Sequence, residues 1–315
     1  MQVASGATIR PDLMDAVKEY ASDLNSQFMA LDVLPLANTD FQSGSFGSLP
    51  IENLTDQSSA GKRAPGSGYN RQQSEITTDT YTCEEFGFEE PVDDGEARRM
   101  GIYFDAELGA AQINEFRLRR AQEVRAASLL FSTSNFSGHT GNVTNEWNDA
   151  TNGVPYSDVQ GKLLTLKQAV GGAIDGEICL AVSEKVFRNM YMTAEIKAMR
   201  AGGAGGTFDK VAPSAAEMAN ILGINQVFHS SAQNAAADIW DDEYALLFIR
   251  SMSPILSSSV QLGRTFLWTA DTDANATIES YRDEAVRSNI VRARQYCDEK
   301  VFNYAAGYLF QNITS

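Results

Sequence analysis

The most regular hydrophobic pattern of the chain lies in residues 96–131, where apolar side chains recur at helical spacing. Ala and Arg favour a helix there, whereas Gly101 and Gly109 weaken its start, so the helix is expected to begin nearer Asp105. A helix of about 25 residues spans roughly 40 Å, which is long for a compact domain and indicates a strut. The residues expected on its apolar face are Met100, Phe104, Leu108, Ala111, Phe116, Ala121, Val124 and Leu129.

Residues 156–255 alternate between helical and strand patterns and predict an α/β lobe. Ser157, Ser183 and Ser214 stand at the N-cap positions of three expected helices. The helix after Ser157 is expected to end at Gly171, and the helix after Ser183 is expected to continue to Arg200. Short apolar runs predict strands at residues 177–182, 224–228 and 244–249.

Both ends of the chain have extended patterns. A short helix is expected after Pro11, and residues 28–54 have no period of their own, which indicates an extended arm on other parts of an assembly or an ordinary lead-in segment. Residues 288–304 favour a strand, although the spacing of residues 282–303 also fits a helix. Further strands are expected at residues 263–269 and 307–313. One face of the strand at 288–304 is expected to hold Ile290, Arg292, Arg294 and Tyr296.

Residues 61–96 are polar and divide into two parts of opposite charge. Residues 61–71 contain Lys62, Arg63 and Arg71 and no acidic residue, whereas the remainder is rich in Asp and Glu and has threonines that favour β structure. The pattern predicts a long two-stranded arm with too few apolar residues to offset its ordering entropy. Because a lone hairpin is marginal in water, such an arm is either disordered or ordered by a neighbour.

Composition narrows the class of protein. A chain of 315 residues with 43% hydrophobic residues can bury a large core in one to three domains. The net charge of −16 disfavours a large groove for nucleic-acid phosphates. The sequence has no apolar run long enough for a membrane span and no apolar signal core near Met1. The three cysteines, Cys83, Cys179 and Cys297, are isolated in the sequence. This argues against a disulfide framework and favours a protein of a reducing compartment.

No catalytic, cofactor-binding or metal-binding constellation is expected. His139 and His229 lack ligands at suitable spacing; the first is expected to be exposed and the second to be satisfied at the end of a strand. The glycine-rich residues 201–207 lack the Lys-Ser/Thr of a phosphate loop and are expected to be a flexible loop. Residues 271–279 resemble a calcium loop but have Arg282 at the twelfth position, so a turn between strands is favoured. Cys179 is expected in the core.

The order of these elements resembles the major capsid protein of tailed bacteriophages, which has the Hong Kong 97-type fold. Each stretch by itself is a weak signal, whereas the order and spacing together cover nearly the whole chain. Residues 63–94 look like the extended loop of that family, and residues 104–130 resemble its spine helix. The stretches that resemble its axial and peripheral strands and helices are residues 178–190, 216–234, 239–249, 262–268 and 288–310.

The resemblance implies an α+β fold. Its parts would be an N-terminal arm, an extended β-hairpin loop, a peripheral domain with the spine helix and β strands, and an α/β axial domain. The corresponding residues are 1–54 for the arm, 55–95 for the loop, 96–155 with 256–304 for the peripheral domain, and 156–255 with 305–315 for the axial domain.

The function implied by the resemblance is structural rather than enzymatic. Copies of the chain would form hexamers and pentamers of an icosahedral phage head around double-stranded DNA, assembled in the host bacterial cytoplasm and located in the virion capsid. Expected partners are a scaffolding protein, a portal protein and a decoration protein, with weak contact to DNA and none to a membrane. Because the arm starts almost at Met1, scaffolding is expected from a separate protein or from a segment removed from a precursor.

The charge-split arm suggests how subunits could meet, with Arg63 and Arg71 of one copy against carboxylates of the next; the alternative is a solvated hairpin. Covalent cross-linking through Lys62 is not favoured, because no local signature marks an Asn partner. Two other functions stay open, namely an encapsulin-like nanocompartment with the same fold and an α/β enzyme built on residues 156–255. The candidate inter-subunit contact residues are Lys62, Arg63, Arg71, Glu84, Glu85, Glu89 and Glu90.

Overall fold

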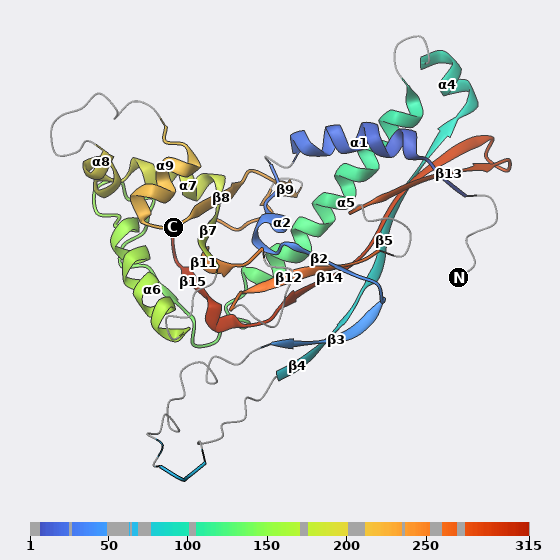
Figure 1. The fold of residues 1–315 in the computed structure, drawn as a ribbon. Helices are drawn as coiled ribbons and strands as arrows, with labels where there is room; N and C mark the ends of the chain where they lie inside the picture. Colours follow the sequence, from blue (N-terminus) through green and yellow to red (C-terminus); the bar gives the residue numbers. More distant parts are fainter. Residues whose placement is uncertain are drawn as a thin grey trace.

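Two β-sheets and a long helix define the architecture. Helix α5 (Ala106–Leu130) runs from a six-stranded sheet to a five-stranded sheet, and a small two-stranded arm extends from the body near the bottom of the view (Figure 1). This mixed arrangement confirms the predicted α+β class. The computed structural model describes residues 7–24, 27–48, 63, 65–68, 77–100, 105–170, 176–200, 212–234, 237–252, 260–269 and 275–314.

Helix α5 begins at its expected N-cap. The carboxylate of Asp105 accepts hydrogen bonds from the backbone N–H of Glu107 at 3.0 Å and of Leu108 at 3.3 Å, which satisfies two donors that the first turn leaves free. The preceding residues form a separate helix, α4 (Asp94–Met100), and residues 101–104 lie outside the described part. The predicted start near Asp105 is therefore confirmed.

The buried face of α5 differs from the predicted apolar face. Of the predicted residues, Ala111 is buried, whereas Val124 is exposed. The buried face instead combines small apolar residues with polar ones, such as Asn114, whose side-chain amide donates to the carbonyl of Val291 at 3.0 Å. The sequence pattern failed here because buried polar groups with partners do not appear as apolar positions. The buried residues are Ala110, Ala111, Asn114, Glu115, Leu118, Gln122, Glu123, Ala126, Ala127 and Leu130.

The six-stranded sheet is built around one long strand, β14 (Ser288–Val301), and confirms the strand predicted there in place of a helix. β13 and β12 pair with one edge of β14 and β5 with the other, all antiparallel, while β2 runs parallel to β12 and β1 pairs with β13. Helices α5 and α1 (Pro11–Leu24) cover one face of this sheet. The other strands are β1 (Thr8–Ile9), β2 (Leu36–Thr39), β5 (Glu84–Asp93), β12 (Gly263–Trp268) and β13 (Thr277–Asp283).

The five-stranded sheet has the order β6-β15-β11-β7-β8 and forms the centre of the α/β lobe. Helices α6 to α9 pack on one face, and the C-terminal end of α5 packs on the other face together with α2 (Ala30–Val33). The strands are β6 (Thr140–Asn142), β7 (Glu177–Ser183), β8 (Gln226–Ser230), β11 (Ala245–Arg250) and β15 (Gly307–Gln311). The helices are α6 (Pro155–Ala169), α7 (Glu184–Met192), α8 (Ala194–Arg200) and α9 (Ala215–Leu222).

Two of the three predicted helix starts in this lobe are confirmed. Ser183 and Ser214 are N-caps whose hydroxyls accept backbone N–H groups three residues later. Ser157 is not a cap, because α6 already begins at Pro155, and its hydroxyl donates to Glu195 instead. The single helix predicted after Ser183 is divided at Thr193, which has extended backbone geometry.

The two-stranded arm pairs differently from the prediction. β4 (Thr77–Thr82) pairs antiparallel with β3 (Ser43–Ser48), which the sequence pattern had assigned to the N-terminal arm. The predicted pairing of residues 61–71 with the acidic part is thus wrong for residues 77–82. The acidic strand β5 pairs with β14, so it belongs to the six-stranded sheet rather than to a free hairpin. Two further short strands, β9 (Gln233–Asn234) and β10 (Ala237–Asp238), form a separate hairpin.

Candidate inter-subunit surfaces

The base of the β3–β4 arm is anchored by aromatic side chains. The ring of Tyr81 stacks on Phe266 with 4.3 Å between centroids, and Phe46 lies 4.6 Å from Phe302. The hydroxyl of Tyr81 also forms a hydrogen bond of 2.6 Å with the hydroxyl of Thr39. These contacts fix the direction in which the arm leaves the body, since aromatic clusters bury much area in a defined geometry.

Of the basic candidates of the arm, Arg63 belongs to the described part of the chain. Arg63 is exposed, and its Nε donates to the backbone carbonyl of Ser67 at 2.6 Å. Lys62 and Arg71 lie outside the described residues. The contact between these cations and carboxylates of a second copy therefore stays a prediction.

Three of the four acidic candidates already have an arginine within the chain. Glu89 accepts a hydrogen bond from Arg292 at 2.6 Å, and Glu90 accepts one from Arg117 at 2.7 Å. Glu85 is farther from its cation, with 3.9 Å to Nη1 of Arg294, and Glu84 is exposed. Glu89 and Glu90 are thus engaged in ion pairs within the chain. Glu84 and Glu85 are the acidic candidates that are better placed to meet a partner.

A set of ion pairs lies on the face of the six-stranded sheet that points away from α5, and the sequence pattern did not predict it. Arg294 donates to Glu279 at 2.5 Å, and Nη1 of Arg292 lies 3.6 Å from the other oxygen of Glu279. The alternation of Arg292 and Arg294 in one strand was visible in the sequence, but their partners on β5 and β13 depend on the register. Cross-strand pairs of opposite charge stabilise a register more than they stabilise a fold.

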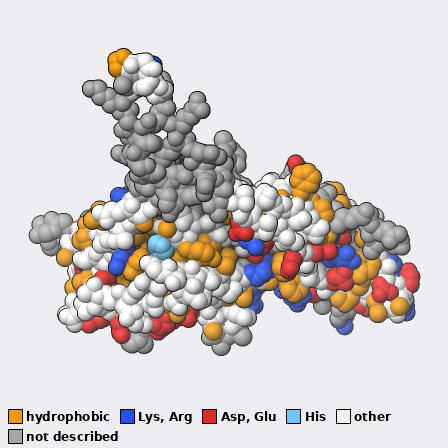
Figure 2. All heavy atoms as spheres, turned by 90° about the horizontal axis from the view of Figure 1, so that it is seen from below, with side chains coloured by type: hydrophobic (Ala, Val, Ile, Leu, Met, Phe, Trp, Pro, Cys, Tyr) orange, Lys and Arg blue, Asp and Glu red, His pale blue; other side chains and the backbone are white. Residues whose placement is uncertain are grey.

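Charged side chains also concentrate at one end of the molecule. On the face shown in Figure 2, Lys, Arg, Asp and Glu gather toward the end that carries α4 and β13 in Figure 1, whereas hydrophobic side chains are spread more widely. Single exposed hydrophobic residues are normal on a protein surface. The most exposed large ones include Phe41, Leu164, Met192, Met252 and Val286.

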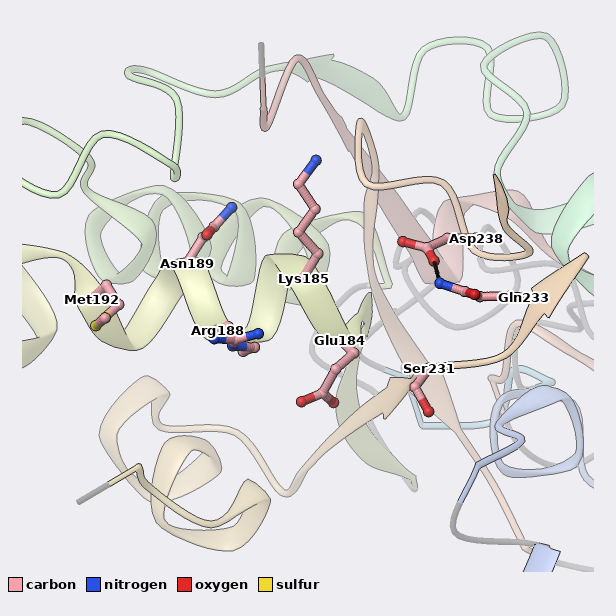
Figure 3. Close-up of a pocket in the computed structure, with 8 residues that line it drawn as sticks. All are labelled: Glu184, Lys185, Arg188, Asn189, Met192, Ser231, Gln233 and Asp238. Atoms are coloured by element: carbon pink, nitrogen blue, oxygen red, sulfur yellow. Dashed lines mark hydrogen bonds between the residues drawn. The ribbon is translucent and has the colours of Figure 1, made fainter. Parts of the chain in front are cut away.

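A pocket of about 410 Å³ lies beside α7 (Figure 3). Lys185 points to one side of the helix, whereas Glu184 and Arg188 lie on the other. The imidazole Nδ1 of His229 lies 2.6 Å from the Glu184 carboxylate, and its ring stacks on Phe187, so the predicted satisfied position of His229 is confirmed. Charges of both signs and two amides make the lining of this pocket polar. The lining residues are Glu184, Lys185, Arg188, Asn189, Met192, Ser231, Gln233 and Asp238.

The cysteines are unsuited to nucleophilic chemistry. All three are free and buried, and the predicted core position of Cys179 is confirmed. Burial raises the pKa of the Cys83 thiol to about 11 and that of the Cys179 thiol to about 12, so both are protonated near neutral pH. His139 is half-buried rather than exposed, and its backbone carbonyl accepts the N–H of Leu309.

The described residues hold no group of three or more His, Cys, Asp or Glu side chains that could bind a metal ion. No helix in the same part of the chain is long and apolar enough to cross a membrane. The glycine-rich residues 201–207 and residues 271–274 of the predicted turn lie outside the described part, and residues 277–279 belong to β13.

Comparison with known proteins gives matches only at the level of structure. No family model matches the chain, and no curated protein matches it significantly. A phage-related protein from Bordetella bronchiseptica RB50 is similar over 98% of each chain, with a TM-score of 0.70 and 16% identity. The capsid structure of cyanophage P-SCSP1u is similar over 91% of this chain and 88% of its own, with a TM-score of 0.60 and 10% identity.

The chain has the Hong Kong 97-type fold. The same fold extends to the holo-SrpI encapsulin complex from Synechococcus elongatus PCC 7942, which has 10% identity, covers 90% of this chain and 86% of its own, and has a TM-score of 0.53. At such low identities the likeness concerns the fold alone. The Hong Kong 97-type fold is thus compatible with both of the shell functions considered from the sequence.

Proposed function

We propose that this chain is a structural shell subunit, the major capsid protein of a phage head. The observation that supports this most is the likeness to the cyanophage capsid over about nine-tenths of the chain. A fold does not fix a function, but here the likeness covers about nine-tenths of both chains rather than one lobe. The described pocket beside α7 is polar, and the buried cysteines are protonated, which gives no support to an enzyme.

The shape of the molecule supports assembly through unlike surfaces. Its β3–β4 arm stands off the body (Figure 1) and is anchored at its base by aromatic contacts. A face of the six-stranded sheet carries charge of both signs. An arm on one copy and a flat face on the next form a head-to-tail contact, which closes into rings when the rotation fits. We propose hexamers and pentamers built by such contacts.

The finer assignments extend this proposal. The six-stranded sheet with α5 would be the core of the peripheral domain and the five-stranded sheet the core of the axial domain. Under this assignment β2 and β5 join the peripheral domain although they lie outside its predicted range, and β6 joins the axial domain although it lies outside that one. The shell would enclose double-stranded DNA with weak, sequence-independent contacts, as the net charge of −16 favours. Its proposed partners are a scaffolding protein, a portal protein and a decoration protein, and its proposed location is the virion after assembly in the host cytoplasm.

An encapsulin-like compartment is the second candidate, supported by the likeness to the encapsulin complex. The two candidates differ in what the shell contains rather than in how it is built. Nucleic acid inside the particles, measured by absorbance and nuclease protection, would support the phage head. A co-purifying protein cargo without nucleic acid would support the compartment.

The first experiment is electron microscopy, with sizing, of the chain expressed alone and with its neighbouring genes. Closed shells or rings are expected in at least one of the two samples. A chain that stays monomeric in both samples would contradict the proposed function.

The arm contact is tested separately by the double variant Arg63→Glu with Arg71→Glu. Its matched control is Arg98→Glu with Lys167→Glu, which makes the same charge change at two exposed positions outside the arm. Loss of particles only in the arm variant is expected, because reversed charges would repel the carboxylates of the next copy. Equal yields in both variants would remove the arm contact from the proposal and leave the shell function standing.

A further inference from the structure

A buried carboxylate joins three separate segments of the chain at the end of α5 that meets the five-stranded sheet. Glu123 on α5 is 2% exposed. Its Oε1 accepts the backbone N–H of Ala30 at 2.6 Å, and its Oε2 accepts the indole N–H of Trp240 at 2.6 Å. Ala30 begins α2, and Trp240 precedes β11. One side chain therefore ties the N-terminal segment and the five-stranded sheet to the long helix.

No lysine, arginine or histidine of the described chain forms an ion pair with this carboxylate. The charged group that shifts the pKa of Glu123 is another acid, Asp32 of α2, which raises it. The positive charge of Arg250 in turn lowers the pKa of Asp32. Arg119 lines the same cavity but pairs with Glu115 at 2.6 Å. A charge at Glu123 is therefore stabilised by N–H donors, those of Ala30, Met29 and Trp240, and not by a cation, which is a costly arrangement for a buried ion.

A cavity of about 290 Å³ adjoins the carboxylate and gives water a place to enter. It is lined by Phe28, Leu31, Asp32, Leu36, Arg119, Gln122, Glu123 and Asn275. Two buried polar atoms of this lining, Nε2 of Gln122 and Oδ1 of Asn275, have no hydrogen-bond partner. A polar, roomy site of this kind accepts water readily, so a small displacement of α2 would hydrate Glu123.

We propose that Glu123 is a proton-controlled latch: when it is protonated it holds the α2 segment and the Trp240 loop against α5, and when it loses its proton this junction opens locally. The proposal concerns the folded chain itself and does not depend on the proposed shell function. It supplies a way for the relative position of the two sheets to respond to pH, since α5 and α2 connect them.

The direction of the response follows from linkage. Desolvation raises the pKa of Glu123 to about 7, the N–H donors of Ala30, Trp240 and Met29 lower it, and the charge of Asp32 raises it further. In an opened, hydrated junction the pKa would return to the ordinary 4.5. A raised folded-state pKa of an acid stabilises the closed form below pH 4.5. That stabilisation is lost as the pH rises from 4.5 to 7, with no further loss above 7.

Hydrogen exchange of the full-length purified chain tests the latch. The opening constant of the amides in residues 29–33, corrected for intrinsic exchange, is expected to rise roughly 50- to 100-fold between pH 5 and 8.5 and to level off above 7. Glu123→Gln is expected to reduce this rise to less than about tenfold, because the amide cannot ionise. Any remainder comes from Asp32, whose pKa burial also raises, and is expected to vanish when Asp32→Asn is added.

Two further variants keep the test decisive. Asp32→Asn alone removes a nearby negative charge and is expected to move the midpoint of the rise to lower pH. Glu299→Gln is the matched control, a mostly buried carboxylate paired with Arg125 of the same helix, and should leave the response unchanged. A flat wild-type profile, or an undiminished rise in Glu123→Gln, would overturn the latch. If Glu123→Gln does not fold, an unmoved midpoint in Asp32→Asn would overturn it equally.

Discussion

The two sheets of this molecule are stabilised by different kinds of contact. In the five-stranded sheet every residue of β11 is buried, and apolar layers cover both faces. In the six-stranded sheet one face packs under α1 and α5, whereas the other carries Arg292, Arg294 and their carboxylate partners. Helices of the same chain cover both faces of the five-stranded sheet. The polar face of the six-stranded sheet holds a buried pair, Arg294–Glu279, and a partly exposed pair, Arg292–Glu89, and the exposed pair could also serve a neighbouring copy.

The physical reason lies in what each contact depends on. Apolar burial requires only that water be removed, so the five-stranded sheet is expected to fold in the isolated subunit. Exposed ion pairs contribute little to a single chain, because solvent screens them, but they fix register and orientation between surfaces. The difference between the sheets therefore separates what stabilises the subunit from what positions it.

The largest expected effect comes from the five-stranded sheet. Phe248→Ala removes a fully buried ring from β11 and should lower the free energy of unfolding by about 4 kcal/mol. Phe88→Ala on β5, where the ring is partly exposed, should cost much less. Denaturant unfolding followed by circular dichroism measures both. Equal losses would erase the distinction between the sheets.

The buried ion pair of the six-stranded sheet comes next. Arg294→Met leaves Glu279, which is 3% exposed, with only the more distant Arg292, and should cost about 3 kcal/mol. Adding Glu279→Leu should recover most of this loss, because no buried charge then remains. Thermal unfolding of the single and double variants tests the pair, and a double variant no more stable than Arg294→Met would contradict the explanation.

A smaller effect is expected where the long helix begins. Asp105→Ala removes the acceptor for two backbone N–H groups and should destabilise the chain by about 1 kcal/mol. Asp105→Ser keeps a capping oxygen and should retain most of the stability. Equal losses of stability for the Ala and Ser variants in urea unfolding would show that Asp105 does not stabilise the helix by capping it.

The smallest effect on the isolated chain is expected at the surface ion pairs. Glu89→Gln should change the free energy of unfolding by less than about 1 kcal/mol, because its carboxylate is largely solvated. Its effect on particle yield should be larger if this face meets another copy. A double-mutant cycle with Arg292→Gln, measured on subunits and on particles, compares the two. No excess effect on particles would mean that the pair serves only the register of β5.

Local sequence patterns predicted much of the fold. The long helix, its start at Asp105, the caps at Ser183 and Ser214 and the strand at β14 all depend on neighbours in sequence, and all are confirmed. The partner of β4 could not be predicted in this way. Apart from Phe46, residues 43–48 are serines and glycines, and they become a strand because Phe46 meets Phe266 and Phe302 from distant parts of the chain.

The candidate contact residues show the same division. Their charges were readable, but the pairing of Glu89 and Glu90 with Arg292 and Arg117 depends on strand register and helix placement. Glu123 gave no signal in the sequence, because a glutamate on an arginine-rich helix is usually solvated. Its burial is decided by α2 and Trp240.

By itself, the sequence determined the α+β class, the order of the elements and the resemblance to a shell-forming fold, because periodicity, capping and turn chemistry act over a few residues. Only the tertiary structure decided which polar side chains are buried, which acids are neutralised and how the arm is anchored. Those outcomes depend on contacts between residues far apart in the chain, whose distances no local pattern contains.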